Sequence, residues 1–302
     1  MLQEAVEKMG LKISSGSRLL ADARFSGLHS AICGKHPAFA RCLDRLYLPK
    51  LDKKKPYDVF TSNNIALLNR GLFRRLKDRY DVRTVLVTQN VFNNERYPEL
   101  LGRNIEDLKE EFDLIVTTER ADAERFGLLF MPNTFYNPLG NEVPEVIYDL
   151  SFAGADKGRG TGVRKIAGEA KKAGVSADMR IVGNGPKNGA VKYVPPLPYT
   201  EIIRRDLETN CILELLQPGQ TTATLRYQEA VCLNKKLLTN NPYVEQEDFY
   251  DPRFIRVFRD EKDIDWDFVK ERIKVDYGYD GRYSSPEWVR KIQMELDRRK
   301  DI

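Results

Sequence analysis

The stretch CILELLQPGQTTATLRYQEAVCLNKKLLTNN, residues 211–241, decides the fold. It begins with an apolar run, passes through a polar turn that contains Pro218 and Gly219, and then shows helical spacing of apolar residues. A second apolar run closes the stretch at residues 236–241. Two short apolar runs joined by a helix form a crossover unit, in which both strands run parallel in one sheet. The stretch therefore predicts an α/β fold.

The same alternation extends along most of the chain. Short apolar runs alternate with amphipathic stretches over residues 57–133 and again over residues 147–258. Between them, TFYNPLGNEVPEV carries two prolines and a glycine that interrupt the pattern. We therefore place a domain boundary near Asn141 and predict two doubly wound, Rossmann-like halves, residues 1–141 and 142–283, with a cleft between them.

The two ends of the chain have different patterns. Residues 284–302 predict a helix, because Ser285 is suited to the N-cap, a proline comes next, and apolar residues recur every four positions from Trp288. The first 50 residues lack the apolar strand that opens most such domains. Either the natural protein is longer at this end, or the first half has a smaller sheet.

Composition narrows the class of protein. The chain has 302 residues, with 49 basic and 45 acidic side chains dispersed along it, which does not favour nucleic acid as a partner. No apolar run reaches the roughly 18 residues of a membrane span, and no signal peptide opens the sequence, so we expect a cytoplasmic protein. The four cysteines are too far apart for a zinc pattern, and with two histidines the sequence predicts no metal site.

Basic and aromatic residues are mixed over residues 18–55. One interpretation is a patch that makes peripheral contact with the inner membrane surface, where basic side chains attract anionic lipid. The other is an ordinary pair of helices whose apolar side belongs to the core. The pattern leaves both interpretations open.

The polar turn in the opening stretch is a candidate ligand site. In an open α/β sheet, ligands bind outside the carboxyl ends of the strands, where helix N-termini present unpaired N–H groups. Gly219 lets the backbone approach a ligand, Arg226 offers a forked cation for a diphosphate, and Glu229 can accept both hydroxyls of a ribose. The turn adds the polar groups of Gln217, Gly219, Gln220, Thr221 and Thr222. Alternatively, the turn only caps a helix and Glu229 is solvated.

Two further glycine turns come after strands of the same half. One spans residues 152–162 and combines Gly154 with the basic residues Lys157 and Arg159, and the other contains Gly183. Neither has the spacing of a dinucleotide fingerprint or a P-loop. Three glycine turns at one sheet edge nevertheless favour a nucleotide diphosphate as the ligand.

Segments of the C-terminal half, in order, resemble the nucleotide-sugar-binding half of GT-B glycosyltransferases. They are YDLSFAGADKGR, DMRIVG, LPYTEII, the opening stretch and DFYDPRFIRVF, all within residues 148–258. The sequence is most similar to bacterial lipopolysaccharide and capsular polysaccharide biosynthesis transferases that carry PGQTGLTMR…EALGLGKKLITTN…YDFY. The N-terminal half is similar only in its α/β rhythm and in residues 112–133, FDLIVTTERADAERFGLLFMPN.

This resemblance implies that the C-terminal half binds the donor and the N-terminal half the acceptor. It implies that Glu229 holds the donor ribose, that Arg226 and the turn from Gly219 to Thr222 lie at the diphosphate and sugar, and that Gly154 lines the phosphates. The segment YVPPLPY, with Pro196 and Tyr199, would lie against the base. The last helix commonly crosses back to the first domain in that family.

The sequence departs from the family pattern at two positions. Many retaining members carry a second glutamate eight residues before the ribose-binding one, where this chain has Thr221. Thr222 replaces the glycine that lets the donor approach in the family. The resemblance therefore implies neither a retaining nor an inverting reaction, nor a particular sugar.

The predicted activity is that of a hexosyltransferase-like glycosyltransferase. It would move a sugar from a UDP- or GDP-linked donor, its substrate, to a saccharide or lipid-linked acceptor in bacterial surface polysaccharide synthesis, without a cofactor or metal. The one near match to a metal-binding Asp-x-Asp pair, DIDWD at residues 263–267, is interpreted as a solvated acidic loop. Glu119, after a predicted strand, is the candidate catalytic base, with Glu95 as an alternative.

Two other functions stay open from the sequence. One is a nucleotide-sugar epimerase of the same fold, disfavoured because both histidines precede residue 40. The other is a non-catalytic partner subunit that binds a nucleotide-sugar, suggested by the missing first strand and by Thr221.

Overall fold

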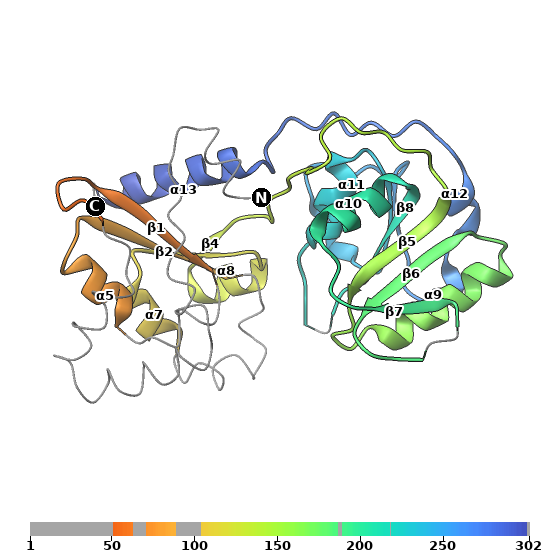
Figure 1. The fold of residues 1–302 in the computed structure, drawn as a ribbon, viewed down its shortest axis with the longest axis horizontal. Coiled ribbons are helices and arrows are strands. Elements are labelled where there is room, and N and C mark those ends of the chain that lie inside the picture. Colours follow the sequence, from red (N-terminus) through yellow and green to blue (C-terminus); the bar gives the residue numbers. More distant parts are fainter. Residues whose placement is uncertain (1–50, 63–70, 89–103, 187–188, 218, 301–302) are drawn as a thin grey trace. The chain divides into compact units, whose positions relative to one another are not determined.

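A computed structural model of the protein describes residues 51–62, 71–88, 104–186, 189–217 and 219–300. These residues divide into two compact units. The C-terminal unit runs from Pro132 to Trp288, and the N-terminal unit comprises the residues up to Met131 together with residues 289–300. Each unit contains one parallel β-sheet flanked by helices (Figure 1). The prediction of an α/β fold with two Rossmann-like domains is confirmed.

The sheet of the N-terminal unit has the order β1-β2-β3-β4, and every neighbouring pair is parallel. Its strands are β1 (Tyr57–Ser62), β2 (Val82–Thr88), β3 (Leu114–Thr117) and β4 (Leu129–Phe130). The helices are α5 (Leu72–Lys77), α7 (Ile105–Glu111) and α8 (Arg120–Phe126). β3 is buried along its whole length and β2 is nearly so, as expected for central strands that are covered on both faces.

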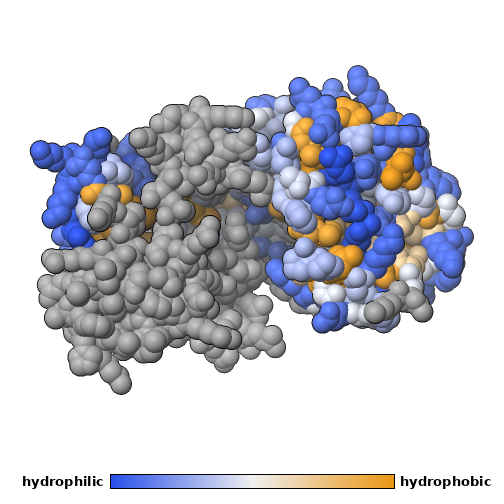
Figure 2. All heavy atoms as spheres, viewed as in Figure 1, coloured by the Kyte–Doolittle hydropathy of each residue, from blue (hydrophilic) through white to orange (hydrophobic). Residues whose placement is uncertain are grey.

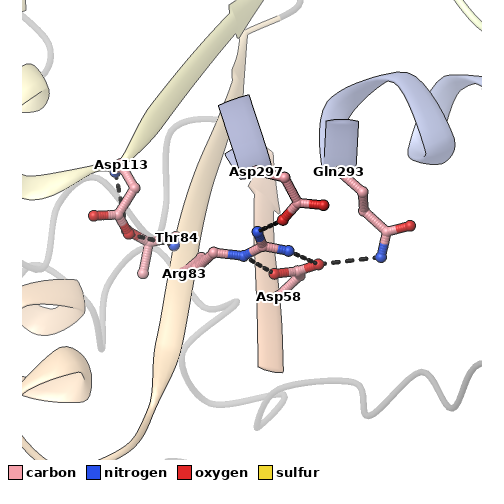
Figure 3. A network of polar contacts seen from close by, with 6 residues as sticks. All are labelled: Asp58, Arg83, Thr84, Asp113, Gln293 and Asp297. Carbon is pink, nitrogen blue, oxygen red and sulfur yellow. Dashed lines mark hydrogen bonds and ion pairs between the residues drawn. The ribbon is translucent and has the colours of Figure 1, made fainter. Parts of the chain in front are cut away.

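The helix α13 (Ser285–Lys300) carries the end of the chain onto β1 and β2. Arg83 in β2 donates two hydrogen bonds to Asp58 in β1, of 2.6 Å from Nε and 2.9 Å from Nη2. Gln293 donates to the same carboxylate at 3.1 Å, and Asp297 pairs with Arg83 (Figure 3). Ile292 is also buried on this helix. The last helix is therefore part of the N-terminal unit.

The sheet of the C-terminal unit has the order β10-β9-β8-β5-β6-β7, again with parallel neighbours only. Its strands are β5 (Tyr148–Ala155), β6 (Ala177–Val182), β7 (Val191–Val194), β8 (Thr209–Glu214), β9 (Lys236–Thr239) and β10 (Ile255–Val257). The chain runs outward from β5 to β6 and β7 on one side, and outward from β8 to β9 and β10 on the other. The switch point between β5 and β8 is where ligands bind in such sheets.

Helices cover both faces of this sheet (Figure 1). The helices are α9 (Gly160–Lys172), α10 (Tyr199–Leu207), α11 (Leu225–Cys232) and α12 (Trp266–Lys270), with short 3₁₀ turns η1 (Pro242–Gln246) and η2 (Glu261–Asp263). α9 and α12 share one apolar cluster, whereas α10 and α11 share the other. DIDWD, predicted to be a solvated acidic loop, has exposed aspartates, but the segment runs from the end of η2 into the first turn of α12, with Asp265 as the cap of that helix.

Two side chains at the amino ends of the strands hold the end of α12. Asn210 donates to the carbonyl oxygens of Val269 and Glu271 at 2.7 and 2.9 Å. The fully buried Lys236 donates to the carbonyl of Phe268 and, at 2.5 Å, to that of Glu271. The last carbonyls of a helix lack partners within it, so these donors satisfy groups that would otherwise be buried alone.

The surface of the C-terminal unit is mixed in character. On the face seen in Figure 2, its apolar residues form separate patches among polar ones. Val143, in the stretch that interrupts the alternation, is 90% exposed. Within the described ranges, no helix combines the length and the apolar character needed to cross a membrane.

Candidate functional site

A buried carboxylate at the end of β8 fixes the turn that leads into α11. Glu214 is fully buried, and its Oε1 accepts a 2.8 Å hydrogen bond from the backbone N–H of Thr224. Its Oε2 accepts a 2.6 Å hydrogen bond from the hydroxyl of Thr239, at the end of β9. Thr224 is the N-cap of α11, and its hydroxyl oxygen accepts from the N–H of Arg226. Glu214 thus ties the start of α11 to two neighbouring strands.

The turn residues predicted from the sequence lie together between these anchors. The amide of Leu216 donates to the side chain of Asn240 at 2.8 Å, and the amide of Gln217 donates to the side chain of Gln220 at 3.2 Å. Gly219 has φ 85°, a left-handed conformation that glycine adopts without a steric penalty. Gly219 is exposed, Gln217, Gln220 and Thr221 are half-buried, and Thr222 is buried.

Arg159 joins the loop after β5 to the end of β8. Its Nη1 donates to the carbonyl of Leu215 at 2.9 Å, and its Nη2 donates to the carbonyl of Ala155 at 2.6 Å. A Cβ at Gly154 would lie 3.2 Å from Nη2, so the glycine leaves room for the guanidinium. Arg159 is therefore held at the switch point by two backbone groups from adjacent strands.

The charges around Arg159 and Arg226 influence one another. Burial lowers the pKa of Arg159, the positive charge of Arg226 lowers it further, and Asp156 and Glu214 oppose the shift. The two guanidinium groups are close enough to repel each other, while the nearby carboxylates offset part of their positive charge. An anionic ligand would reduce this repulsion.

The N-terminus of α9 is satisfied by a side chain of its own loop. Asp156 accepts hydrogen bonds of 3.0 Å from the backbone N–H groups of Gly158 and Gly160. Lys157, between them, is exposed. Because a carboxylate already occupies these donors, the contribution of this loop to an anion site comes from the Arg159 side chain.

Arg226 lies between two buried carboxylates. Its Nη1 donates a 2.8 Å hydrogen bond to Asp206 Oδ2 in α10 and lies 2.7 Å from Glu229 Oε2 in α11. The second contact is an ion pair by distance but not a well-directed hydrogen bond. The side chains of Arg226, Asp206 and Glu229 are 15%, 3% and 0% exposed. The hydroxyl of Tyr199, at the start of α10, borders the Glu229 carboxylate.

Burial is the largest influence on the pKa values of the two carboxyl groups in this cluster. It raises the pKa of Glu229 to about 8, although the charge of Arg226 lowers it. It raises the pKa of Asp206 to about 6, again against the charge of Arg226. One guanidinium cannot compensate two carboxylates that have both lost their hydration. The cluster therefore keeps a proton into the neutral pH range.

A cavity of about 380 Å³ opens beside this edge of the sheet. Its lining includes Gly158 and Arg159 at the start of α9, Gln217 after β8, Asn240 after β9 and Arg259 after β10. A volume of this size is within the range of small-molecule sites. The cavity brings together two predicted residues, Arg159 and Gln217, and adds Asn240 and Arg259.

Other predicted residues lie apart from this cavity. Gly183 and Pro196 are exposed, in the loops after β6 and β7. Glu119, the candidate base, belongs to the N-terminal unit, where it is 4% exposed and occupies the N-cap position of α8 without a capping hydrogen bond from its side chain. Its backbone N–H donates to the Thr117 hydroxyl at 3.1 Å. The alternative base, Glu95, lies outside the described residues.

Sequence reasoning missed Glu214 and Asp206. The signal for Glu214 is one acid within the apolar run CILELL, where burial is expected and a charge requires a partner. Asp206 has no comparable signal, because it follows two arginines in the last turn of α10, where a charged side chain is ordinarily solvated. Its importance depends on the contact with Arg226, which is 20 residues away in sequence.

The fold defines the class of this protein: the chain has the GT-B fold, with two Rossmann-like domains. It is similar to the solved structure of a UDP-forming α,α-trehalose-phosphate synthase from Burkholderia xenovorans, with TM-score 0.53 and 10% identity over 91% of this chain and 79% of that one. For the α,α-trehalose-phosphate synthase (UDP-forming) of Burkholderia vietnamiensis, the TM-score is 0.52 and the identity 9%, over 97% and 82% of the two chains.

The α,α-trehalose 6-phosphate synthase of Burkholderia multivorans is similar to the same degree, with TM-score 0.52 and 9% identity over 92% of this chain and 74% of that one. No family model matches the sequence, and no curated protein matches it. At these identities, the likeness to the solved structures establishes the fold alone.

Proposed function

We propose that this protein is a glycosyltransferase that takes its sugar from a nucleotide diphosphate donor bound to the C-terminal unit. The observation that carries the proposal is a pair of guanidinium groups whose charges interact: Arg159, held at the switch point of the sheet, and Arg226, held by Asp206. The solved structures with this fold include UDP-forming synthases, which supports the same class of donor.

The proposed chemistry depends on the charge of the leaving group. When the bond to the sugar breaks, negative charge develops on the diphosphate, and fixed cations stabilise that charge. Arg159 and Arg226 supply these cations. Tyr199 and Pro196 would lie near the base. Glu229, which the sequence places at the ribose hydroxyls, is 0% exposed and paired with Arg226, so we assign it no contact with the ligand.

The remaining parts of the proposal rest on the sequence. The similarity of residues 148–258 to polysaccharide biosynthesis transferases supports a saccharide or lipid-linked acceptor in bacterial surface polysaccharide synthesis. We propose a cytoplasmic enzyme that works without a metal. Glu119 is the proposed base for the acceptor hydroxyl, which is a role for an acid near a strand end.

Isothermal titration calorimetry with UDP, GDP, UDP-glucose and GDP-mannose tests the proposal. We expect one nucleotide series to bind, and Arg226→Met to weaken that binding at least tenfold, by about 1.4 kcal/mol or more. Arg253→Met is the matched control, because Arg253 pairs with Asp251 in the same unit and is 73% exposed. It should leave the affinity unchanged.

A slow hydrolysis of the bound nucleotide-sugar without acceptor is also expected. Absence of binding to all four compounds contradicts the proposal. Binding with no turnover of the donor would instead support the non-catalytic partner.

A further inference from the structure

The shortest contacts of Arg226 with its two carboxylates both involve one nitrogen. Both carboxylate contacts, with Asp206 at 2.8 Å and with Glu229 at 2.7 Å, end on Nη1. Among the described residues, Nε and Nη2 make no hydrogen bond, and the Arg226 side chain as a whole is 15% exposed. A guanidinium presents its donors in a rigid fork, so fixing Nη1 also fixes the directions of the others.

Of the two carboxylates that contact Arg226, that of Asp206 is the one that accepts a hydrogen bond with good geometry. Asp206 belongs to α10, a different helix from Arg226, and is 3% exposed. Glu229 lies one turn away on the same helix as Arg226 and makes an ion pair without good hydrogen-bond geometry. The bond from Arg226 to Asp206 therefore sets the orientation of the guanidinium relative to the rest of the sheet edge.

We propose that Asp206 is a positioning residue for the donor diphosphate: it holds Arg226 by Nη1, so that Nε and Nη2 are presented to the phosphate oxygens. The inference rests on the proposed function. Asp206 does not itself contact the diphosphate, and it acts only through Arg226.

A competing explanation is that Asp206 is merely a negative charge near an anion site. Removing that charge would then strengthen anion binding, because a carboxylate repels phosphate. Positioning predicts the opposite sign, since a misdirected guanidinium loses its hydrogen bonds to the ligand. The two explanations are therefore separated by the direction of the change.

The groups that face Asp206 are Arg226 and Glu229 from α11, Tyr199 from its own helix, and Lys235 ahead of β9. Lys235 donates to the carbonyl of Leu207 at 2.6 Å, and burial lowers its pKa to about 8. Between pH 5 and pH 7 Lys235 and Arg226 stay charged, and Glu229 stays largely protonated, because its pKa is about 8. Asp206, with pKa about 6, is the group of this set that changes charge in that range.

The test compares binding of UDP-glucose and GDP-mannose to the full chain and to Asp206→Asn. We expect the variant to bind about tenfold more weakly, because a neutral amide replaces a charge-assisted acceptor. The matched control is Asp58→Asn, which removes a similar carboxylate from the Arg83 pair in the N-terminal unit and should change affinity less than twofold. Unfolding curves confirm that both variants are folded.

A second measurement compares the pH dependence of binding. The diphosphate diester of UDP-glucose or GDP-mannose keeps its charge between pH 5 and pH 7, unlike a terminal phosphate with a pKa of about 6. The affinity of the wild type should fall as pH decreases through about 6, whereas Asp206→Asn should stay weak and nearly constant.

Equal or tighter binding by Asp206→Asn, or a wild-type affinity that rises toward pH 5, overturns the inference and leaves the proposed function standing. Failure of the wild type to bind either compound overturns the proposed function, and the inference with it.

Discussion

The carboxyl group of Glu229 is fully buried. Among the described residues, the cation that offsets its negative charge is Arg226, which also pairs with Asp206. Arg226 divides its Nη1 between this carboxylate and that of Asp206. Protonation of one carboxyl relieves the imbalance, which is why burial raises the pKa of Glu229 to about 8. Below about pH 8 the Glu229 carboxyl is mostly neutral, and burying a neutral carboxyl destabilises the folded state less than burying a carboxylate would.

The titration of Glu229 makes stability depend on pH. The unfolded chain releases this proton near pH 4.3, whereas the folded protein keeps it to about pH 8, so rising pH favours unfolding between these values. In Glu229→Gln this contribution disappears. We expect the decline in unfolding free energy from pH 5 to pH 8.5 to be smaller in the variant by about 1–3 kcal/mol.

Urea unfolding without ligand at the two pH values measures this difference. Glu245→Gln, at an exposed position, is the control and should show the wild-type slope. Parallel profiles for wild type and Glu229→Gln would refute the assignment of the buried proton.

Glu214 supports the turn through two acceptors on one carboxylate. Glu214→Ala leaves the amide of Thr224 and the hydroxyl of Thr239 without their partner, so we expect the unfolding free energy to fall by about 2–4 kcal/mol. Glu214→Gln can still accept from Thr224 and can donate to Thr239, so the loss should stay below about 1 kcal/mol. Denaturant titration of both variants checks this, and equal losses would show that side-chain volume rather than hydrogen bonding matters.

At the scale of single residues, the sequence identifies those side chains whose positions follow from the succession of strands, turns and helices along the chain. The turn residues and Arg226 come after a strand and open a helix, a pattern visible without the structure. Which groups pair with them is not visible, because Asp206 meets Arg226 from another helix and Glu214 meets Thr239 from another strand. The roles of individual site residues remain predictions.

At the scale of elements, α12 depends on side chains from the sheet beneath it. This helix has five residues, too few to be stable alone, and its last carbonyls meet Lys236 and Asn210. The apolar residues Phe268 and Val269 anchor its other side in the core. The helix exists because tertiary contacts complete it.

Lys236→Met should therefore loosen α12. The variant keeps an apolar stem of similar length but removes the donors to Phe268 and Glu271, and we expect a loss of about 2–3 kcal/mol. Hydrogen exchange should show the greatest increase in the amides of α12. Lys270→Met, which removes only a surface pair with Asp267, should cost less than about 0.5 kcal/mol. An equal effect of the two substitutions would contradict this role of Lys236.

The boundaries of the elements agree with the sequence where local signals are strong. The helical spacing within residues 211–241 corresponds to α11, from Leu225 to Cys232, with Thr224 as its cap. α9 begins within the glycine turn of residues 152–162, at Gly160, because Asp156 accepts from two amides and stabilises the first turn. A carboxylate four residues ahead of a glycine-rich start is a weak signal from sequence alone.

At the scale of the whole molecule, the alternation of strands and helices is sufficient to predict two parallel sheets. Parallel strands require crossover helices, and both units obey this rule. The position of α13 is harder to predict from the sequence, because the ion pair that joins it to β2 links Arg83 and Asp297, which are 214 residues apart. Its apolar spacing predicts a buried face, but only the polar bridge to Asp58 shows where that face lies.

A crystal structure of the protein with UDP or GDP bound is the most direct test of the central claim. We expect the diphosphate at the carboxyl ends of β5 and β8, within hydrogen-bonding distance of the guanidinium groups of Arg159 and Arg226. A nucleotide bound at another place, with both arginines still confined to their protein partners, would contradict the claim.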